Sequence, residues 1–258
     1  MAKYFDLHSH VAWGIDDGMP SREDAASSLK LAKSDGIIGI CSTPHFIPGQ
    51  LDVHIYNEIV TRQLELRDMS PIPIYFGGEV MMNSEFIQNF DLDLYPTING
   101  SRYMLVEYNV LRDIHSIDFR DDCLYEIKVR GYIPVIAHIE RYFHEGLDYS
   151  IIDSWVDMGC VLQLNRTSIL GVNGKTIQAN ALELLDNGYC DLICTDTHRA
   201  SGNRIEKLSD VYSVVSKRIG SENADIVFYE NPKRILKDMD ILDIDVEKKK
   251  KLFGFFGR

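Results

Sequence analysis

The feature that most constrains the fold of this 258-residue chain is a regular alternation of short apolar runs with segments of helical spacing. The apolar runs are rich in Val and Ile and are bounded by Gly, Pro or polar residues, as in buried strands. About seven strand-then-helix units in this order build a parallel sheet. We expect strands at 4–7, 37–42, 72–76, 103–106, 133–137, 161–164 and 192–195, and helices at 21–35, 54–68, 83–90, 118–130, 149–158, 176–187, 204–219, 222–228 and after Pro232.

The first of these helices has sequence signals at both ends. Ser21 followed by Asp24 resembles a capping box, in which polar side chains satisfy free backbone N–H groups of the first turn. Gly36 fits the position after the last helical residue, where the backbone is commonly left-handed. These residues predict a helix that begins after Ser21 and ends before Gly36.

Polar side chains that can bind metal ions stand at or just past the ends of the expected strands. In an open sheet the ends of distant strands cannot meet at a single site, whereas in a closed parallel barrel they surround one face. The pattern therefore favours a barrel over an open doubly wound sheet. The residues concerned are His8, His10, His45, Glu79, Glu107, His138, Asp196 and His198.

These residues, together with Asp17, predict a cluster of metal ions. His8 and His10 are two residues apart, so on a strand their side chains point the same way, and Asp196 and His198 repeat this spacing. Singly, each residue has another interpretation as a loop histidine or a solvated carboxylate. The set of nine exceeds the need of one ion and predicts two or three. Nitrogen and oxygen ligands without thiolate suit manganese, iron or zinc.

Arg141 is the candidate anion-binding residue. It follows a strand that carries a ligand, and a guanidinium can hold two phosphate oxygens at once. An ion pair with Glu140 or another nearby acid is the alternative interpretation. Arg199 and Arg204, which follow the last ligand pair, compete as a second phosphate contact.

The composition argues against several classes of protein. A count of 39 acidic against 27 basic residues gives a formal charge of −12, which disfavours a general nucleic-acid surface. The five cysteines form no CxxC pair, so a thiolate zinc site or a disulfide framework is not expected. The sequence has neither an apolar run of the ~20 residues that cross a bilayer nor a secretory pattern, and we expect a cytoplasmic protein.

The chain reads as one domain, 1–240, followed by a basic and aromatic tail, 241–258. The tail contains Lys248-Lys249-Lys250-Lys251 and three phenylalanines, unlike the rest of this acidic chain. A disordered end is one interpretation, and peripheral contact with an anionic membrane surface or a partner is the other. Deleting residues 246–258 should then weaken co-sedimentation with anionic vesicles, and unchanged partitioning would remove the hypothesis.

The sequence resembles the polymerase and histidinol phosphatase (PHP) superfamily, and within it the bacterial metal-dependent protein-tyrosine phosphatases of capsule and exopolysaccharide clusters. The HxH pair is shared across the superfamily, whereas the AHIERY run is more specific to this branch. The matching segments cover nearly the whole domain. They are Asp6-Leu7-His8-Ser9-His10, Asp16-Asp17-Gly18, Ser42-Thr43-Pro44-His45, Gly78-Glu79, Val106-Glu107-Tyr108, Ile136-Ala137-His138-Ile139-Glu140-Arg141-Tyr142, Gln163-Leu164-Asn165, Thr195-Asp196-Thr197-His198 and Asn231-Pro232.

The resemblance implies an α/β fold of the distorted (β/α)7 TIM-like barrel type and a site with three divalent ions, manganese being preferred. It implies hydrolysis of phosphotyrosine by metal-activated hydroxide, with Arg141 holding the phosphate and Asp17, His45 and His198 also taking part in catalysis. The implied substrate is the tyrosine-rich tail of a bacterial tyrosine kinase that controls polysaccharide export. The implied ligand sets are His8, His10, Glu79 and Asp196; Glu79, Glu107 and His138; and Asp17, His45 and His198.

Two other functions stay open at this point. A small-molecule phosphatase, such as a histidinol-phosphate phosphatase, would use the same metal chemistry and differ only at the rim of its pocket. A non-catalytic PHP-fold module would be expected to have lost ligands, yet all nine positions hold a ligating side chain.

Overall fold

The computed structural model describes residues 2–90 and 94–246. The lysines and phenylalanines of the expected tail lie outside the described residues, so the membrane hypothesis stays a prediction. Residues 241–246 do pack against the body, with Ile241, Ile244 and Val246 in contact with buried apolar clusters. Within the described part of the chain, no helix is long and apolar enough to cross a membrane.

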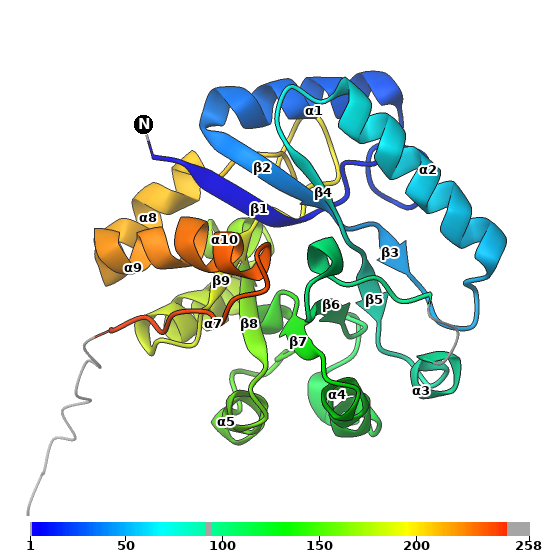
Figure 1. The fold of residues 1–258 in the computed structure, drawn as a ribbon. Helices are drawn as coiled ribbons and strands as arrows, with labels where there is room; N and C mark the ends of the chain where they lie inside the picture. The colour runs from blue at the N-terminus through cyan, green and yellow to red at the C-terminus, as the bar shows by residue number, and fades with distance from the viewer. Residues whose placement is uncertain (1, 91–93, 247–258) are drawn as a thin grey trace, which may run out of the picture.

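In the residues that the structure describes, nine strands are interspersed with helices (Figure 1). The strands are β1 (Tyr4–Ser9), β2 (Ile37–Ser42), β3 (His45–Phe46), β4 (Ile74–Phe76), β5 (Glu79–Met81), β6 (Tyr103–Glu107), β7 (Ile133–Ile136), β8 (Val161–Asn165) and β9 (Leu192–Cys194). The helices are α1 (Arg22–Asp35), α2 (Val53–Met69), α3 (Phe86–Asn89), η2 (Ile98–Gly100), η3 (Ile114–Ser116), α4 (Arg120–Val129), η4 (Ile139–Arg141), α5 (Tyr149–Asp157), α6 (Arg166–Ile169), α7 (Lys175–Asp186), α8 (Ser209–Ile219), α9 (Ser221–Asp225), η5 (Ile226–Glu230) and α10 (Asn231–Ile235).

All pairs of neighbouring strands are parallel, so the expected α/β class with parallel sheets is confirmed. One sheet has the order β1-β2-β4 and the other β3-β5-β6-β7-β8-β9. A backbone bond also links the two sheets, since His10 N–H, just past β1, donates to the Thr197 carbonyl, just past β9, at 2.9 Å. Within the first sheet, Gly77 N–H donates to the Ser42 carbonyl at 3.0 Å and extends the pairing of β2 and β4 toward β3 and β5.

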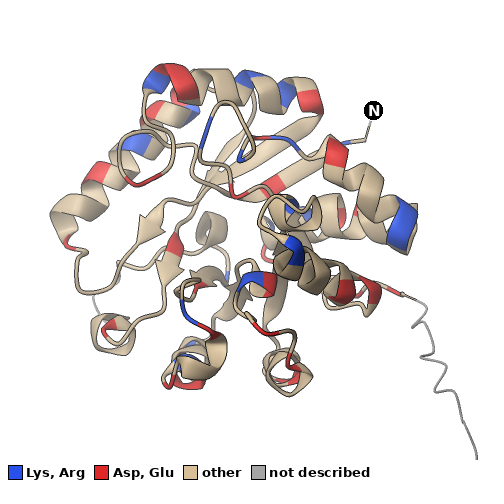
Figure 2. Ribbon diagram, turned by 180° about the vertical axis from the view of Figure 1, so that it is seen from behind, with Lys and Arg blue, Asp and Glu red and all other residues tan. Residues whose placement is uncertain are grey.

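The strands sort their side chains onto two faces. On β6, Met104 and Val106 belong to a large apolar cluster, whereas Tyr103 and Leu105 belong to a smaller one with residues of β1, β7 and β9. Because side chains alternate along a strand, Glu107 continues the face of Tyr103 and Leu105. Figure 1 shows the longer helices on the outside of the strands, and Figure 2 shows that many charged residues lie on these helices.

Most expected elements are present within a few residues of their predicted bounds. Ser21 caps α1 by accepting a hydrogen bond from Asp24 N–H, and Gly36 ends it with φ 100°, as predicted. His45 and Glu79 lie just past the ends of β2 and β4, as predicted. They also begin the short strands β3 and β5, which were not predicted, and pair directly there.

The helix expected at 204–219 begins at Ser209 instead. The reason is that residues 198–204 turn back on themselves, with His198 and Arg199 N–H both donating to the Arg204 carbonyl at 3.1 and 3.0 Å. Helical spacing alone does not report such a turn. Its consequence is that Arg204 faces the candidate site.

Candidate metal centre

All nine predicted ligands converge on one place in the structure. The buried Glu79 carboxylate lies at its middle and accepts close contacts from three imidazoles. Its oxygens lie 3.2 Å from His8 Nε2, 3.1 Å from His10 Nε2 and 3.1 Å from His138 Nε2. These four residues come from the end of β1, from the connection between β4 and β5, where Glu79 begins β5, and from just past the end of β7, and these segments are far apart in the sequence. The prediction that strand ends bring these side chains together is confirmed.

The ligand atoms form overlapping groups within which every pair lies no more than 4.8 Å apart. Glu79 belongs to two groups, as expected of a bridging carboxylate. One difference from the implied division is that Glu107 groups with His45 and Glu79 rather than with His138, from which it is 3.6 Å away. The groups are His10, Asp17, His45 and His198; His8, His10 and Asp196; His8, Glu79 and His138; and His45, Glu79 and Glu107.

The last ligand pair reaches the cluster by a different route from the one predicted. β9 ends at Cys194, so Asp196 and His198 do not share a strand face. Asp196 instead has a left-handed backbone with φ 52°, and His138 has φ 35°. Left-handed backbone in residues other than Gly is uncommon and tends to occur at functional sites, where surrounding structure holds it. Backbone strain at these two ligands therefore aims them at the cluster.

Negative charge dominates the electrostatics around His10 and His45. Burial and the neighbouring His45 disfavour a charged His10, yet Asp16 and Glu79 raise the pKa of His10 to about 9. Burial likewise opposes a charged His45, but interactions with Asp17, Glu107 and Glu79 raise its pKa to about 12. A raised imidazole pKa means that the site stabilises positive charge. Bound divalent cations would meet the same negative field.

The donor set fits divalent metal ions. Histidine nitrogens and carboxylate oxygens are mixed in every group, which matches manganese, iron or zinc better than calcium or a thiolate-bound metal. Two buried atoms at the cluster, His45 Nδ1 and Glu107 Oε1, lie 3.1 Å apart, yet neither makes a hydrogen bond. Buried polar atoms are normally satisfied, so such atoms at a cluster of ligands indicate a role in binding.

Residues outside the predicted set hold the ligands in place. Asp16 accepts from His10 Nδ1 at 2.8 Å, and Gln163 Oε1 lies 3.1 Å from His8 Nδ1. Asn165 donates to Asp196 Oδ2 at 2.8 Å. Partners of this kind fix the orientation and tautomer of a metal-binding imidazole. Asp16, Gln163 and Asn165 occur in the segments that carry the resemblance, but no spacing rule assigns them this role.

Replacing Asp16 by alanine should weaken metal binding by about 10- to 100-fold, the usual effect of losing such an outer partner. His10 would keep its place on the chain but lose the acceptor that orients its ring. Competition titration against a fluorescent chelator measures this affinity. Asp16→Asn retains one acceptor oxygen and should lose less, and an unchanged metal affinity in Asp16→Ala would show that the contact does not orient His10.

Two arginines beside the cluster contact the same carboxylate, that of Asp196. Arg204 Nη2 lies 2.8 Å from Asp196 Oδ1, and Arg141 Nη1 lies 3.4 Å from Asp196 Oδ2. Arg199, in contrast, donates to the backbone carbonyls of Asp17, Gly18 and His198. Of the two arginines that compete as a second phosphate contact, Arg204 is the one whose side chain lies beside a ligand side chain. The alternative interpretation of Arg141, an ion pair with a nearby acid, is also seen, although the acid is Asp196 rather than Glu140.

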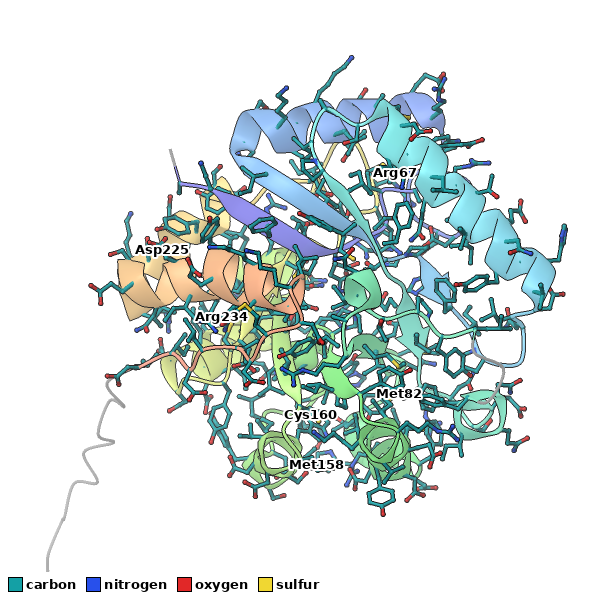
Figure 3. The ribbon with its side chains drawn as sticks, viewed as in Figure 1. Arg67, Met82, Met158, Cys160, Asp225 and Arg234 are labelled. Atoms are coloured by element: carbon teal, nitrogen blue, oxygen red, sulfur yellow. The ribbon has the colours of Figure 1, made fainter. Side chains whose placement is uncertain are left out.

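A cysteine-based phosphatase site is excluded in the described residues. Cys160 and Arg166 have the Cys-x5-Arg spacing of such enzymes, but the residues between them form strand β8 rather than a phosphate-binding loop. Burial raises the pKa of Cys160 to about 12, and Arg166 is paired with Asp210 at 2.7 Å. Figure 3 shows Cys160 close to Met158, which follows helix α5. All five cysteines are buried and free, as expected.

Comparison with known proteins agrees with this geometry. The family model described as capsular polysaccharide synthesis, CpsB/CapC, matches residues 4–237. The chain belongs to this family. The resemblance to the bacterial phosphatases of capsule clusters is thereby confirmed.

Individual relatives are similar over almost their full length. The chain is 28% identical to the tyrosine-protein phosphatase CpsB of Streptococcus pneumoniae, over 90% of this chain and 98% of that protein. It is 27% identical to the tyrosine-protein phosphatase YwqE of Bacillus subtilis, over 97% and 99%. Among solved structures, one of the metal-dependent tyrosine phosphatases YwqE and CpsB superposes with a TM-score of 0.79 at 24% identity, covering 93% of this chain and 96% of that one. This last likeness shows the fold.

Proposed function

We propose that this protein is a metal-dependent protein-tyrosine phosphatase that hydrolyses phosphotyrosine without a covalent phosphocysteine. The observation that carries the proposal is the convergence of nine histidine and carboxylate side chains around Glu79, from strand ends spread between residues 8 and 198. Membership of the CpsB/CapC family and relatives named tyrosine-protein phosphatases support the same activity.

We propose three divalent ions, with manganese the preferred metal and iron or zinc as alternatives. His8, His10, Glu79 and Asp196 would hold one, Glu79, Glu107 and His138 another, and Asp17, His45 and His198 the third. Bound divalent ions supply Lewis acidity, lower the pKa of water and offset the charge that develops on a phosphoryl group. The overlap of the ligand groups at Glu79 and His10 supports several closely spaced ions rather than one.

The phosphate would enter from the side of Asp17 and His45. Their side chains are 64% and 22% exposed, whereas those of His8 and Glu79 are almost completely buried. A substrate can therefore reach the group of Asp17, His45 and His198 first. This accessibility is why we assign these three residues, with Arg141, to the reacting phosphate.

Arg141 and Arg204 would bind the phosphate oxygens. Each now contacts an oxygen of Asp196, so each guanidinium already points at the ligand cluster. A planar guanidinium binds phosphate in a bidentate manner and is always charged at physiological pH. Together they would orient the phosphoryl group and stabilise its charge as the ester bond breaks.

Arg204→Ala should raise KM and lower kcat, with kcat/KM on a phosphotyrosine peptide falling about 100-fold, the order expected for one lost charge-assisted contact to the transition state. Arg199→Ala is the matched control, since Arg199 contacts the backbone carbonyls of Asp17, Gly18 and His198 and not the side-chain atoms that would bind metal or phosphate. Its kcat/KM should fall much less. Steady-state kinetics on both variants decides the assignment, and a larger loss in Arg199→Ala would reverse it.

The architecture that would support this site is a closed, distorted barrel of seven strands formed by a single domain over residues 1–240. β2 with β3, and β4 with β5, would each count as one interrupted strand. The bond between His10 and Thr197 supports closure because it links the end of β1 in one sheet to the end of β9 in the other, and the bond between Gly77 and Ser42 carries the pairing of β2 and β4 on toward β3 and β5. Closure would explain how ligands from the first and last strands meet.

The natural substrate is proposed to be a phosphotyrosine protein in capsule or exopolysaccharide synthesis, in particular the tyrosine-rich tail of a bacterial tyrosine kinase. A small-molecule phosphatase is the alternative with the same metal chemistry. Turnover of a phosphotyrosine peptide and of histidinol phosphate by the metal-loaded protein separates the two. We expect kcat/KM to be higher on the peptide, and a preference for histidinol phosphate would overturn the substrate assignment.

A further inference from the structure

An apolar hollow lies directly beside the accessible side of the ligand cluster. Its volume is about 380 Å³. Asp17 and His45 form its polar edge, and Ile15, Leu51 and Ile55 contribute to its apolar lining. Because Asp17 and His45 are also members of a ligand group, the hollow and the cluster form one continuous surface.

The lining side chains are apolar yet remain open to solvent. Ile15 and Leu51 are half-buried, and Ile55 is 38% exposed. Solvent-accessible apolar side chains gathered around a concave surface, with a few polar groups at one end, are typical of a ligand site. Scattered apolar residues elsewhere, such as the 63% exposed Val53, do not line this hollow.

Local backbone structure holds the lining in place before any ligand binds. Leu51 N–H donates to the Ile47 carbonyl at 3.1 Å in the turn after β3. Asp52 caps helix α2, its side chain accepting from Ile55 N–H at 2.8 Å. Leu51 and Ile55 therefore flank a fixed helix start, and a preformed apolar surface binds a ring with little loss of entropy.

We propose that this hollow holds the phenyl ring of the phosphotyrosyl residue and so selects aromatic phosphate esters. The inference rests on the proposed function, because it requires the phosphate to lie at Asp17, His45 and His198. An aromatic ring attached directly to the ester oxygen would extend from the phosphate into the hollow and cover Ile15, Leu51 and Ile55. Phosphoserine places its polar backbone there instead. Histidinol phosphate places a charged amine there, which apolar side chains disfavour.

Comparing the binding of two phosphonates that cannot be hydrolysed isolates the contribution of the aromatic ring to affinity. Phenylphosphonate and methylphosphonate share the anionic group, but only the first has an aromatic ring. The ratio of their dissociation constants on the manganese-loaded protein therefore measures how much the hollow contributes to binding of the ring. Isothermal titration calorimetry should give about tenfold tighter binding of phenylphosphonate, the size expected for burying part of one ring. Leu51→Asn and Ile55→Asn should each reduce this ratio several-fold while leaving methylphosphonate binding unchanged.

Val53→Asn is the matched control, since Val53 lies on the same helix outside the hollow and should keep the ratio. Thermal melting of each variant confirms that it is folded. Equal binding of the two phosphonates by the unaltered protein, or an unchanged ratio in both folded hollow variants, would overturn the proposal. A ring preference that depends on Leu51 and Ile55 in a protein that does not hydrolyse phosphotyrosine would support the hollow and reject the phosphatase.

Discussion

Replacing Asp196 by alanine should lower kcat/KM on a phosphotyrosine peptide by on the order of 10³-fold, since losing a metal ligand removes several kcal/mol of transition-state stabilisation. Asp196 lies 3.7 Å from both His8 and His10 and accepts from Asn165, Arg141 and Arg204. Burial opposes its charge, but His8, Arg204 and the other histidines hold the pKa of Asp196 well below its usual range. The ionised carboxylate is thus available as a ligand.

The control for this variant is Asp157→Ala, the same change at an exposed position on helix α5. It should retain full activity. Asp196→Ala should remain folded, because strand pairing and the apolar clusters do not depend on this side chain, and circular dichroism checks that. Activity within a few-fold of the unaltered protein, in a folded Asp196→Ala variant, would remove Asp196 from the site.

Chelation should abolish phosphatase activity, and added manganese should restore it. The expected loss is at least on the order of 10³-fold, because the histidines and carboxylates alone cannot supply the Lewis acidity of bound ions. The chain should stay folded but melt at a lower temperature, since a ligand that binds only the native state stabilises it by mass action. Paired activity and melting measurements on treated and reconstituted protein test both statements.

The loss of activity reports the part of the metal in catalysis, and the lower melting temperature reports its part in stability. An inert metal such as calcium should not restore activity, because the mixed nitrogen and oxygen donors suit transition metals better. If chelated protein, with its metal content confirmed as negligible, kept most of its activity, the proposed chemistry would be wrong.

Much of the site was predictable because metal ligands can be recognised by their residue types and by their positions at the ends of predicted strands. His8 lies near the end of β1, and Glu107 ends β6, so a closed parallel architecture predicts that they lie at the same face. The prediction succeeded for Asp196 and His198 although its geometry was wrong, because a left-handed backbone at Asp196 replaces the strand face that was assumed. Position at a strand end mattered more than spacing.

The rest depends on contacts between distant segments, which periodicity does not encode. Gln163 contacts His8 across 155 residues of sequence, and Arg204 reaches Asp196 only because the chain turns back between 198 and 204. Helical spacing extended the predicted α8 over this turn. The apolar hollow could not be predicted for the same reason, since Ile15 comes from the connection after β1 and Ile55 from the first turn of α2.

Hydrolysis of a phosphotyrosine peptide, measured on one preparation at increasing metal occupancy with bound manganese determined alongside, tests the central claim most directly. The account predicts negligible turnover without metal, a rise in kcat as the sites fill, and no turnover at any occupancy in the His8→Ala/His10→Ala double variant. Metal-independent hydrolysis, no hydrolysis by the fully loaded protein, or full activity in the double variant would contradict it.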